Sequence, residues 1–365
     1  MQFPVRHSDI LDRIDSIDPI AYGRTRNDVD GAVTYLSPYI SRGVISTRRV
    51  LDTVMAKGFG LHQVETFAKE LAWRDYFQRI WQHANIDEDL KGNQDHVLHQ
   101  EVPEAVVVAQ TGIQGIDEAI RKMYDTGYMH NHCRMYVASV ACNIGGAHWR
   151  MPARWMYYHL IDGDWGSNAC SWQWVAGSKN GKKYFANQEN INRYTHTQQK
   201  HTFLDVPYEE FPLPEVPDVL ARTMNLLVES SLPASGELNL HEILPVFVYN
   251  YYNLDPDWHA GEEGHRILLL EPDVFQRYPV SEKCMDFMMA MAENIPGIQV
   301  FTGSFHALKE KFSGSEIIYR EHPLNIHYLG RKESREWICE EVTGTFPSFF
   351  SYWKKIEKHL QKRYG

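Results

Sequence analysis

The chain has 365 residues and a mass of 42.5 kDa, which is more than one ordinary core holds, so we expect two domains. Hydrophobic residues make up 43% and charged residues 23%, which is typical of folded globular proteins and excludes a largely disordered chain. The net charge of -10 gives no support for a nucleic-acid partner, although it does not exclude one.

The five cysteines are odd in number and none of them forms a CxxC pair. This argues against a disulfide framework and against a compact Cys-ligated zinc or iron–sulfur site, so we expect no metal. No apolar stretch is long enough to span a membrane, and the N-terminus lacks an apolar signal region. We therefore expect a cytoplasmic protein that does not contact membranes. We also expect a monomer.

The pattern along the chain predicts a mainly α fold, with a helical domain followed by a small α/β domain. Apolar residues recur at helical spacing within residues 1–200, and a Pro/Glu-rich linker follows over residues 201–240. Residues 241–365 then alternate between strand-like runs and helical stretches, which is typical of βαβ units and a small parallel sheet. The strand-like runs are 243–249, 266–270, 298–301 and 316–319. The chain closes on a basic helix, which we interpret as a solvated face rather than a nucleic-acid patch.

A first chemical motif lies in the predicted helix around Glu70. Glu70 and Trp73 are three residues apart and share one helix face. Glu70 and Arg74 are four apart, so a surface ion pair is the alternative explanation of the same residues.

Two further motifs combine polar, sulfur-containing and aromatic side chains. The first runs from Met129 to Met135 and contains His130 and His132; their spacing separates them on a helix, so a metal site there is disfavoured. The second begins with Asp162-Gly163-Asp164 and continues to Trp172-Gln173-Trp174. It resembles the start of a calcium loop, but Gln173 stands where an EF-hand requires Glu.

Together these segments resemble the FAD-binding domain of the cryptochrome/photolyase family, from about residue 22 to about residue 194. Short motifs carry the resemblance, in the order that the family has them. They are Leu36-Ser37-Pro38-Tyr39, Glu70-Leu71-Ala72-Trp73-Arg74, Thr111-Gly112, Ile116-Asp117, Met129-His130-Asn131, Cys133-Arg134-Met135, Asp162-Gly163-Asp164, Asn168 and Trp172-Gln173-Trp174.

The resemblance implies FAD as the cofactor. The residues that match flavin contacts are Tyr22, Thr34, Leu36, Ser37, Arg74, Arg134, Asp162, Asp164 and Asn168. The first four match the cradle of the flavin phosphates, where hydroxyls and backbone N–H groups ahead of a helix suit an anion. Arg134 and Asp162 resemble the ion pair beside the isoalloxazine ring, and Asn168 matches the position that faces flavin N5.

The resemblance also implies a pocket for a pyrimidine dimer in DNA. Five residues match the contacts to this lesion and are our candidates for the catalytic site: Glu70, Trp73, Asn131, Met135 and Trp174. Two indole faces would hold the flipped dinucleotide, and polar side chains would bond its edges.

Trp172 and Trp149 match the inner and middle members of the family's electron-donating tryptophan chain. No Trp stands where the outer member belongs, so another aromatic residue would have to complete the path. The family places its α/β antenna domain first, whereas here the α/β region follows the flavin region. We expect a permuted, shortened relative of the antenna domain, and the sequence leaves an antenna chromophore unknown.

The leading hypothesis is a deoxyribodipyrimidine photolyase-like lyase that repairs cyclobutane pyrimidine dimers under blue light, by electron transfer from excited reduced FAD. A blue-light sensor without repair activity and a light-independent flavin-binding protein are the alternatives.

Overall fold

The computed structural model describes residues 3–238 and 243–365. By its internal contacts the chain divides into two compact units. Unit 1 comprises Ala21–Val33 and His83–Val228, and unit 2 comprises the segment up to Ile20, Thr34–Gln82 and Glu229–Gly365. The helices up to residue 82 therefore group with the C-terminal part of the chain.

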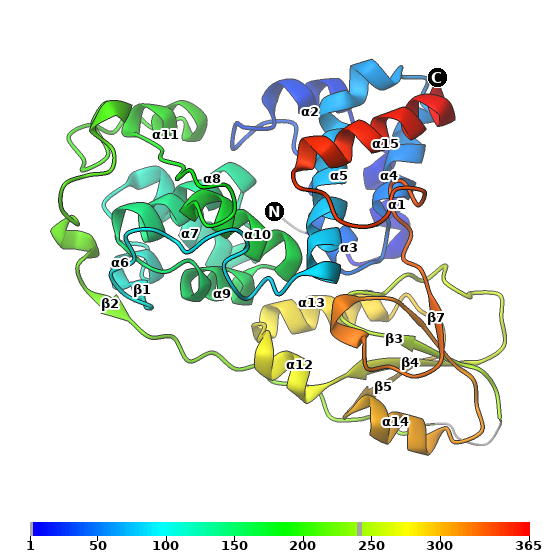
Figure 1. Cartoon of the computed structure of the whole chain (residues 1–365). Helices are drawn as coiled ribbons and strands as arrows, with labels where there is room; N and C mark the ends of the chain where they lie inside the picture. Colours follow the sequence, from blue (N-terminus) through cyan, green and yellow to red (C-terminus); the bar gives the residue numbers. More distant parts are fainter. Residues whose placement is uncertain (1–2, 239–242) are drawn as a thin grey trace. The chain divides into compact units, whose positions relative to one another are not determined.

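Unit 1 is mainly helical, with one short antiparallel strand pair (Figure 1). Its elements are α2 (Pro19–Thr25, which begins in unit 2), β1 (Val102–Pro103), α6 (Glu104–Val107), α7 (Gln114–Thr126), α8 (Asn131–Ala138), a π-helix (Ser139–Ile144), α9 (Arg150–His159), α10 (Trp165–Ala176), α11 (Gln188–Thr195), two 3₁₀ turns (Tyr208–Glu210, Asp218–Leu220) and β2 (Thr223–Met224).

Local capping chemistry fixes where the central helices of unit 1 begin and end. The Asp164 side chain accepts a hydrogen bond from Ser167 N at 3.0 Å and so caps the N-terminus of α10. Gly177 ends the same helix in the left-handed conformation, at φ 89°, where a side chain would be strained. α10 packs against both α8 and α9, which gathers the motifs around Asn131 and Asp162 into one unit.

Unit 2 combines helices from both ends of the described chain with one parallel sheet. Its elements are α1 (His7–Asp15), α3 (Ser37–Ser41), α4 (Thr47–Met55), α5 (Leu61–His83), β3 (Val246–Tyr249), β4 (His265–Leu270), α12 (Pro272–Arg277), α13 (Glu282–Ala292), β5 (Ile298–Thr302), α14 (Phe305–Lys311), β6 (Ile317–Arg320), a 3₁₀ turn (Pro323–Asn325), β7 (Arg331–Glu333) and α15 (Phe349–Tyr364).

The sheet has five parallel strands in the order β5-β4-β3-β6-β7. Val246, Ile267 and Phe301 belong to a core cluster that includes Phe305 and Leu308 of α14, and in Figure 1 α13 covers the other face. Helices on both faces bury the central strands, which explains their continuous apolar runs. β7 has the sequence Arg-Lys-Glu and lies at the edge, so no apolar pattern announced it.

The predicted helices and the small parallel sheet are confirmed, but the order of a complete helical domain followed by an α/β domain is not. The predicted domain boundaries at residues 200 and 241 stay predictions. Residues 239–242, where the predicted linker ends and the α/β domain begins, lie outside the described residues. Within the described ranges, no helix is both long and apolar enough to cross a membrane.

Candidate functional site

A buried ion pair in unit 1 joins two of the predicted flavin contacts. Arg134 on α8 places its NH2 atom 2.9 and 2.8 Å from the two carboxylate oxygens of Asp162. The Asp162 side chain is only 2% exposed and that of Arg134 is 21% exposed. Arg134 Nε also donates to the Met129 carbonyl at 2.8 Å, which fixes the guanidinium direction. Because a buried carboxylate is strongly destabilising when unpaired, these two residues depend on each other.

Asp164 and Asn168 lie at the start of α10, next to this pair in sequence, and both are buried. Asn168 Nδ2 donates to the Ala153 carbonyl at 2.8 Å, so its amide is held in one orientation. Ser167 Oγ is buried and has no hydrogen-bond partner among the described residues. Buried hydroxyls are normally satisfied, so this atom is available to a molecule that the protein itself does not contain.

The predicted phosphate cradle falls on both units. Tyr22 lies on α2 in unit 1, whereas Thr34, Leu36 and Ser37 precede or begin α3 in unit 2. Thr34 Oγ1 accepts a hydrogen bond from Leu36 N at 3.4 Å, and Tyr35 between them has a φ of 54°. Non-glycine residues seldom adopt this left-handed conformation, which makes the loop a locally constrained turn.

Arg74 lies on α5 in unit 2, where it is partly exposed.

The five predicted lesion contacts are likewise distributed between the units. Asn131 and Met135 lie on α8 and Trp174 on α10, two helices that pack together in unit 1. Asn131 is exposed and the other two are half-buried, so all three remain accessible. Glu70 and Trp73 lie on α5 in unit 2, and both are half-buried.

Trp73 has a partner that the sequence did not reveal. Its ring stacks on Phe349, the first residue of α15, with centroids 3.7 Å apart and planes within 9°. Phe77, one turn further along α5, lies 5.2 Å from the same indole. One face of the predicted stacking platform is therefore covered by the C-terminal helix.

Two tryptophans of unit 1, Trp149 and Trp165, form a second aromatic pair. Trp149 is fully buried and donates its indole N–H to Asp89 at 2.6 Å. Its ring lies 6.4 Å from that of Trp165, which in turn donates to Asp87 at 2.9 Å. Trp172, the other residue that matches the electron-donating chain, is buried on α10. The contact of the Trp165 indole with a carboxylate is a property of the packed structure alone.

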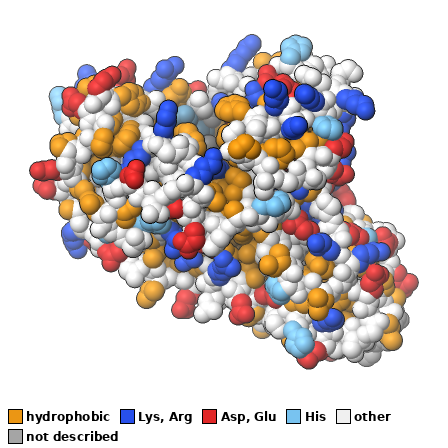
Figure 2. All heavy atoms as spheres, in the orientation of Figure 1, with side chains coloured by type: hydrophobic (Ala, Val, Ile, Leu, Met, Phe, Trp, Pro, Cys, Tyr) orange, Lys and Arg blue, Asp and Glu red, His pale blue; other side chains and the backbone are white. Residues whose placement is uncertain are grey.

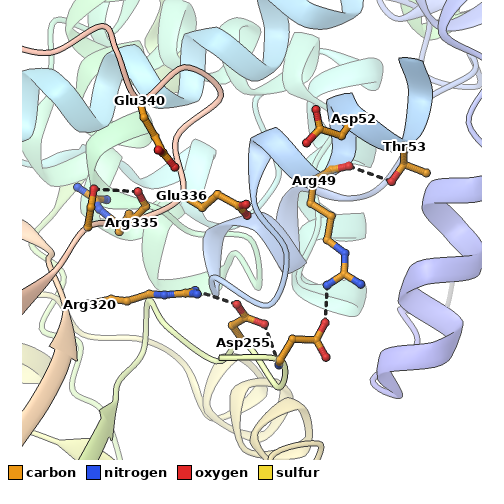
Figure 3. A pocket seen from close by; sticks show the side chains of 10 residues that line it. Arg49, Asp52, Thr53, Asp255, Arg320, Arg335, Glu336 and Glu340 are labelled. Atoms are coloured by element: carbon orange, nitrogen blue, oxygen red, sulfur yellow. Dashed lines mark hydrogen bonds and ion pairs between the residues drawn. The ribbon is translucent and has the colours of Figure 1, made fainter. Parts of the chain in front are cut away.

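A charged pocket of about 480 Å³ lies in unit 2, where segments after β3, β6 and β7 meet α4 (Figure 3). Its lining residues are Arg49, Asp52, Thr53, Asp255, Asp257, Arg320, Ser334, Arg335, Glu336 and Glu340. This is the carboxyl edge of the parallel sheet, where ligands of such folds commonly bind. Arg49 pairs with Asp257 at 2.6 Å and Arg320 with Asp255 at 2.9 Å. The lining nevertheless holds more acidic than basic side chains, so the pocket is acidic overall.

Comparison with known proteins shows that part of this chain is similar to photolyases and cryptochromes. A family model described as the FAD binding domain of DNA photolyase matches residues 67–206. A deoxyribodipyrimidine photo-lyase of Vibrio cholerae is 31% identical over 163 residues, which is 41% of this chain and 34% of that protein. A cryptochrome DASH of Danio rerio is 32% identical over 174 residues, 44% of this chain and 32% of that protein. The chain spans about a third of the length of these curated relatives.

Two solved structures show a partial likeness. A Synechocystis cryptochrome has 26% identity and a TM-score of 0.45, covering 53% of this chain and 44% of that one. An archaeal photolyase from Sulfolobus tokodaii, described with two FAD molecules, has 24% identity and a TM-score of 0.45, with 52% and 44% coverage.

Proposed function

We propose that the chain, whose residues 67–206 match the FAD binding domain of DNA photolyase, repairs cyclobutane pyrimidine dimers in DNA under blue light. The observation that supports this proposal most directly is on α8 and α10. α8 carries Arg134, the loop before α10 carries its buried partner Asp162, and the two helices carry three of the five residues expected to contact the lesion.

The residues of unit 1 fit a flavin. Asp162, Asp164 and Asn168 provide two buried carboxylates and an amide, which suit a planar ring with both N–H and carbonyl groups at its edge. The unpartnered Ser167 hydroxyl adds a polar atom at the same place. With Arg134 these residues would hold FAD, which supplies one-electron chemistry driven by light when bound.

The protein's own part in repair is to bind and orient the dimer. Trp174 offers an aromatic surface for an unstacked base, and Asn131 offers an amide that both donates and accepts hydrogen bonds. Met135 is flexible enough to fill an irregular gap between them. Glu70 on α5 would accept hydrogen bonds from the polar edge of the dimer.

A light sensor without repair activity is the second candidate, and one observation favours it. The stacking of Phe349 on Trp73 occupies a face that a dimer would need. A protein whose pocket is covered by its own C-terminal helix could use that contact for signalling instead of turnover.

The test uses a thymine-dimer oligonucleotide, single- or double-stranded, with the reduced, FAD-loaded protein in blue light or in darkness. We expect light-dependent repair by the parent, and loss of repair in Glu70→Ala with bound FAD unchanged. Loss of a hydrogen bond to a buried polar group weakens binding by roughly 1–3 kcal/mol.

Glu65→Ala is the matched control, because Glu65 lies on the same helix and pairs with Lys69 at 2.5 Å. It should leave repair intact. Absence of repair by a fully reduced, FAD-loaded parent on both substrates would reject the repair proposal in favour of the sensor.

A further inference from the structure

Three side chains with metal-binding atoms converge at the C-terminal helix, and none of them was among the predicted site residues. They are Cys339, Glu341 and His359, and their Sγ, carboxylate and imidazole atoms all lie within 4.8 Å of one another. Cys339 is fully buried, whereas Glu341 is exposed, so the group opens to solvent on one side. His359 belongs to α15, and the other two belong to the loop before it.

Backbone contacts hold this loop in place independently of the three side chains. Ile338 N donates to Asp75 Oδ2 on α5 at 2.8 Å, and the Ile338 carbonyl accepts from Arg363 at 3.0 Å. Arg79 of α5 donates to the Val342 carbonyl at 3.1 Å. Residues directly before and after the cysteine segment are thus anchored to both helices, which pre-organises the group.

We propose that Cys339, Glu341 and His359 form a zinc site that joins the loop to α15. Thiolate, imidazole and carboxylate are the three side-chain ligand classes of Zn²⁺, whereas Mg²⁺ and Ca²⁺ take oxygen ligands. Ligands about 2.0–2.3 Å from a tetrahedral zinc lie roughly 3.3–3.8 Å apart. Cys339 Sγ already lies 3.2 Å from Glu341 Oε2, so small side-chain movements complete the geometry.

The proton and charge balance of binding is simple. Zn²⁺ replaces the thiol proton of Cys339, which leaves to solvent, and a water molecule takes the fourth position on the open side. Arg363 NH2 lies 3.5 Å from Glu341 Oε2 and competes for that oxygen, but a carboxylate has a second oxygen for the metal.

The site would have a structural consequence. It ties the last turns of α15 to the loop that bonds α5, and the first residue of α15 is the one that covers Trp73. A bound metal would hold this helix in place over the aromatic cluster.

The experiment titrates the metal-free full-length protein with Co²⁺ in a non-thiol reductant, and then displaces it with Zn²⁺. We expect one equivalent of Co²⁺ with a thiolate charge-transfer band and tetrahedral visible bands. His359→Ala should weaken binding at least about tenfold, because even the loss of an outer partner of a metal ligand has that effect. Cys339→Ser should abolish the charge-transfer band.

Cys284→Ser is the matched control, since Cys284 is also a buried cysteine of unit 2 and its Sγ accepts a hydrogen bond from Ser281 Oγ instead. It should retain the full spectrum, and Zn²⁺ should raise the melting temperature of this variant and the parent but not of His359→Ala. Absence of the thiolate band in the parent, or its persistence in Cys339→Ser, would overturn the proposal. Neither readout depends on flavin or repair.

Discussion

At the scale of single residues, Asp75 shows how the packed structure changes an ordinary side chain. This carboxylate on α5 is buried and accepts hydrogen bonds from Thr47 Oγ1 at 3.0 Å and Ile338 N at 2.8 Å. Burial raises its pKa to about 6, against hydrogen bonds that lower it. The folded protein therefore binds this proton more tightly than the unfolded chain, whose pKa is near 3.8.

The sign of the pH dependence follows directly. Protonation of Asp75 stabilises the folded state relative to the unfolded chain, because the folded state has the higher pKa. This contribution to the free energy of unfolding is complete below the unfolded-state pKa and is lost as the pH rises through about 6. Asp75→Asn removes that dependence, so its free energy of unfolding should vary less than the parent's between about pH 4 and pH 7. Each unit of pKa shift is worth about 1.4 kcal/mol.

Urea unfolding at several pH values measures this difference, with Asp286→Asn on the exposed side of α13 as the control. Equal slopes in the parent and Asp75→Asn would contradict the prediction.

At the scale of elements, α15 packs its aromatic side chains against those of α5. Its buried residues include Tyr352, Trp353 and Ile356. Figure 2 shows several Lys and Arg side chains gathered over the region where Figure 1 draws α15. Exposed lysines are Lys354, Lys355, Lys358 and Lys362. The helix is thus amphipathic, and its interpretation as a packed helix with a solvated basic face agrees with the burial.

Phe349→Ala should uncover one face of Trp73. If the protein binds pyrimidine dimers, the variant should bind a dimer oligonucleotide more tightly than the parent, because a base can then stack where Phe349 lay. Phe350→Ala is the control, since Phe350 is 70% exposed and adjacent in sequence. Fluorescence anisotropy measures both. Equal affinities for Phe349→Ala and the parent would mean that the covered face takes no part in binding.

A second element-scale prediction concerns the indole group of unit 1. Trp149→Phe should slow light-driven reduction of bound flavin, because Trp149 matches a member of the family's electron-donating chain. Trp165 lies too close to Trp149 to serve as a neutral comparison. Trp258→Phe in unit 2 is the better control, since its indole donates to Glu333 beside the sheet. Transient absorption measures the rates, and identical rates in both variants would place the electron path elsewhere.

At the scale of the whole molecule, the chain crosses between its two units several times. The sequence motifs that match a flavin site come from both, so neither unit contains the full predicted set. The net charge of -10 also means that any DNA binding must come from a local arrangement and from stacking, because the chain as a whole repels phosphates. The proposal of repair rests on the match of residues 67–206 to the FAD binding domain of DNA photolyase.

The sequence by itself determined most of the elements and the likeness of one segment to a known FAD-binding domain. Helical spacing around Val64 and Ile116, and the strand-like runs after residue 243, predicted α5, α7 and the parallel sheet, because local periodicity reflects which face is buried. Short motifs such as Asp162-Gly163-Asp164 can be recognised because several residues of defined type stand next to one another. These features need only nearby positions, so a single sequence carries them.

Only the tertiary structure decided which distant residues meet. Phe349 covers Trp73 from 276 positions away, and the ligands of the proposed zinc site, Cys339, Glu341 and His359, have no compact spacing that a motif could reveal. The edge strand β7 and the carboxyl-edge pocket likewise depend on neighbours elsewhere in the chain. The physical reason is that these contacts arise from the packing of complete elements, and packing leaves no local periodicity in the residues that it brings together.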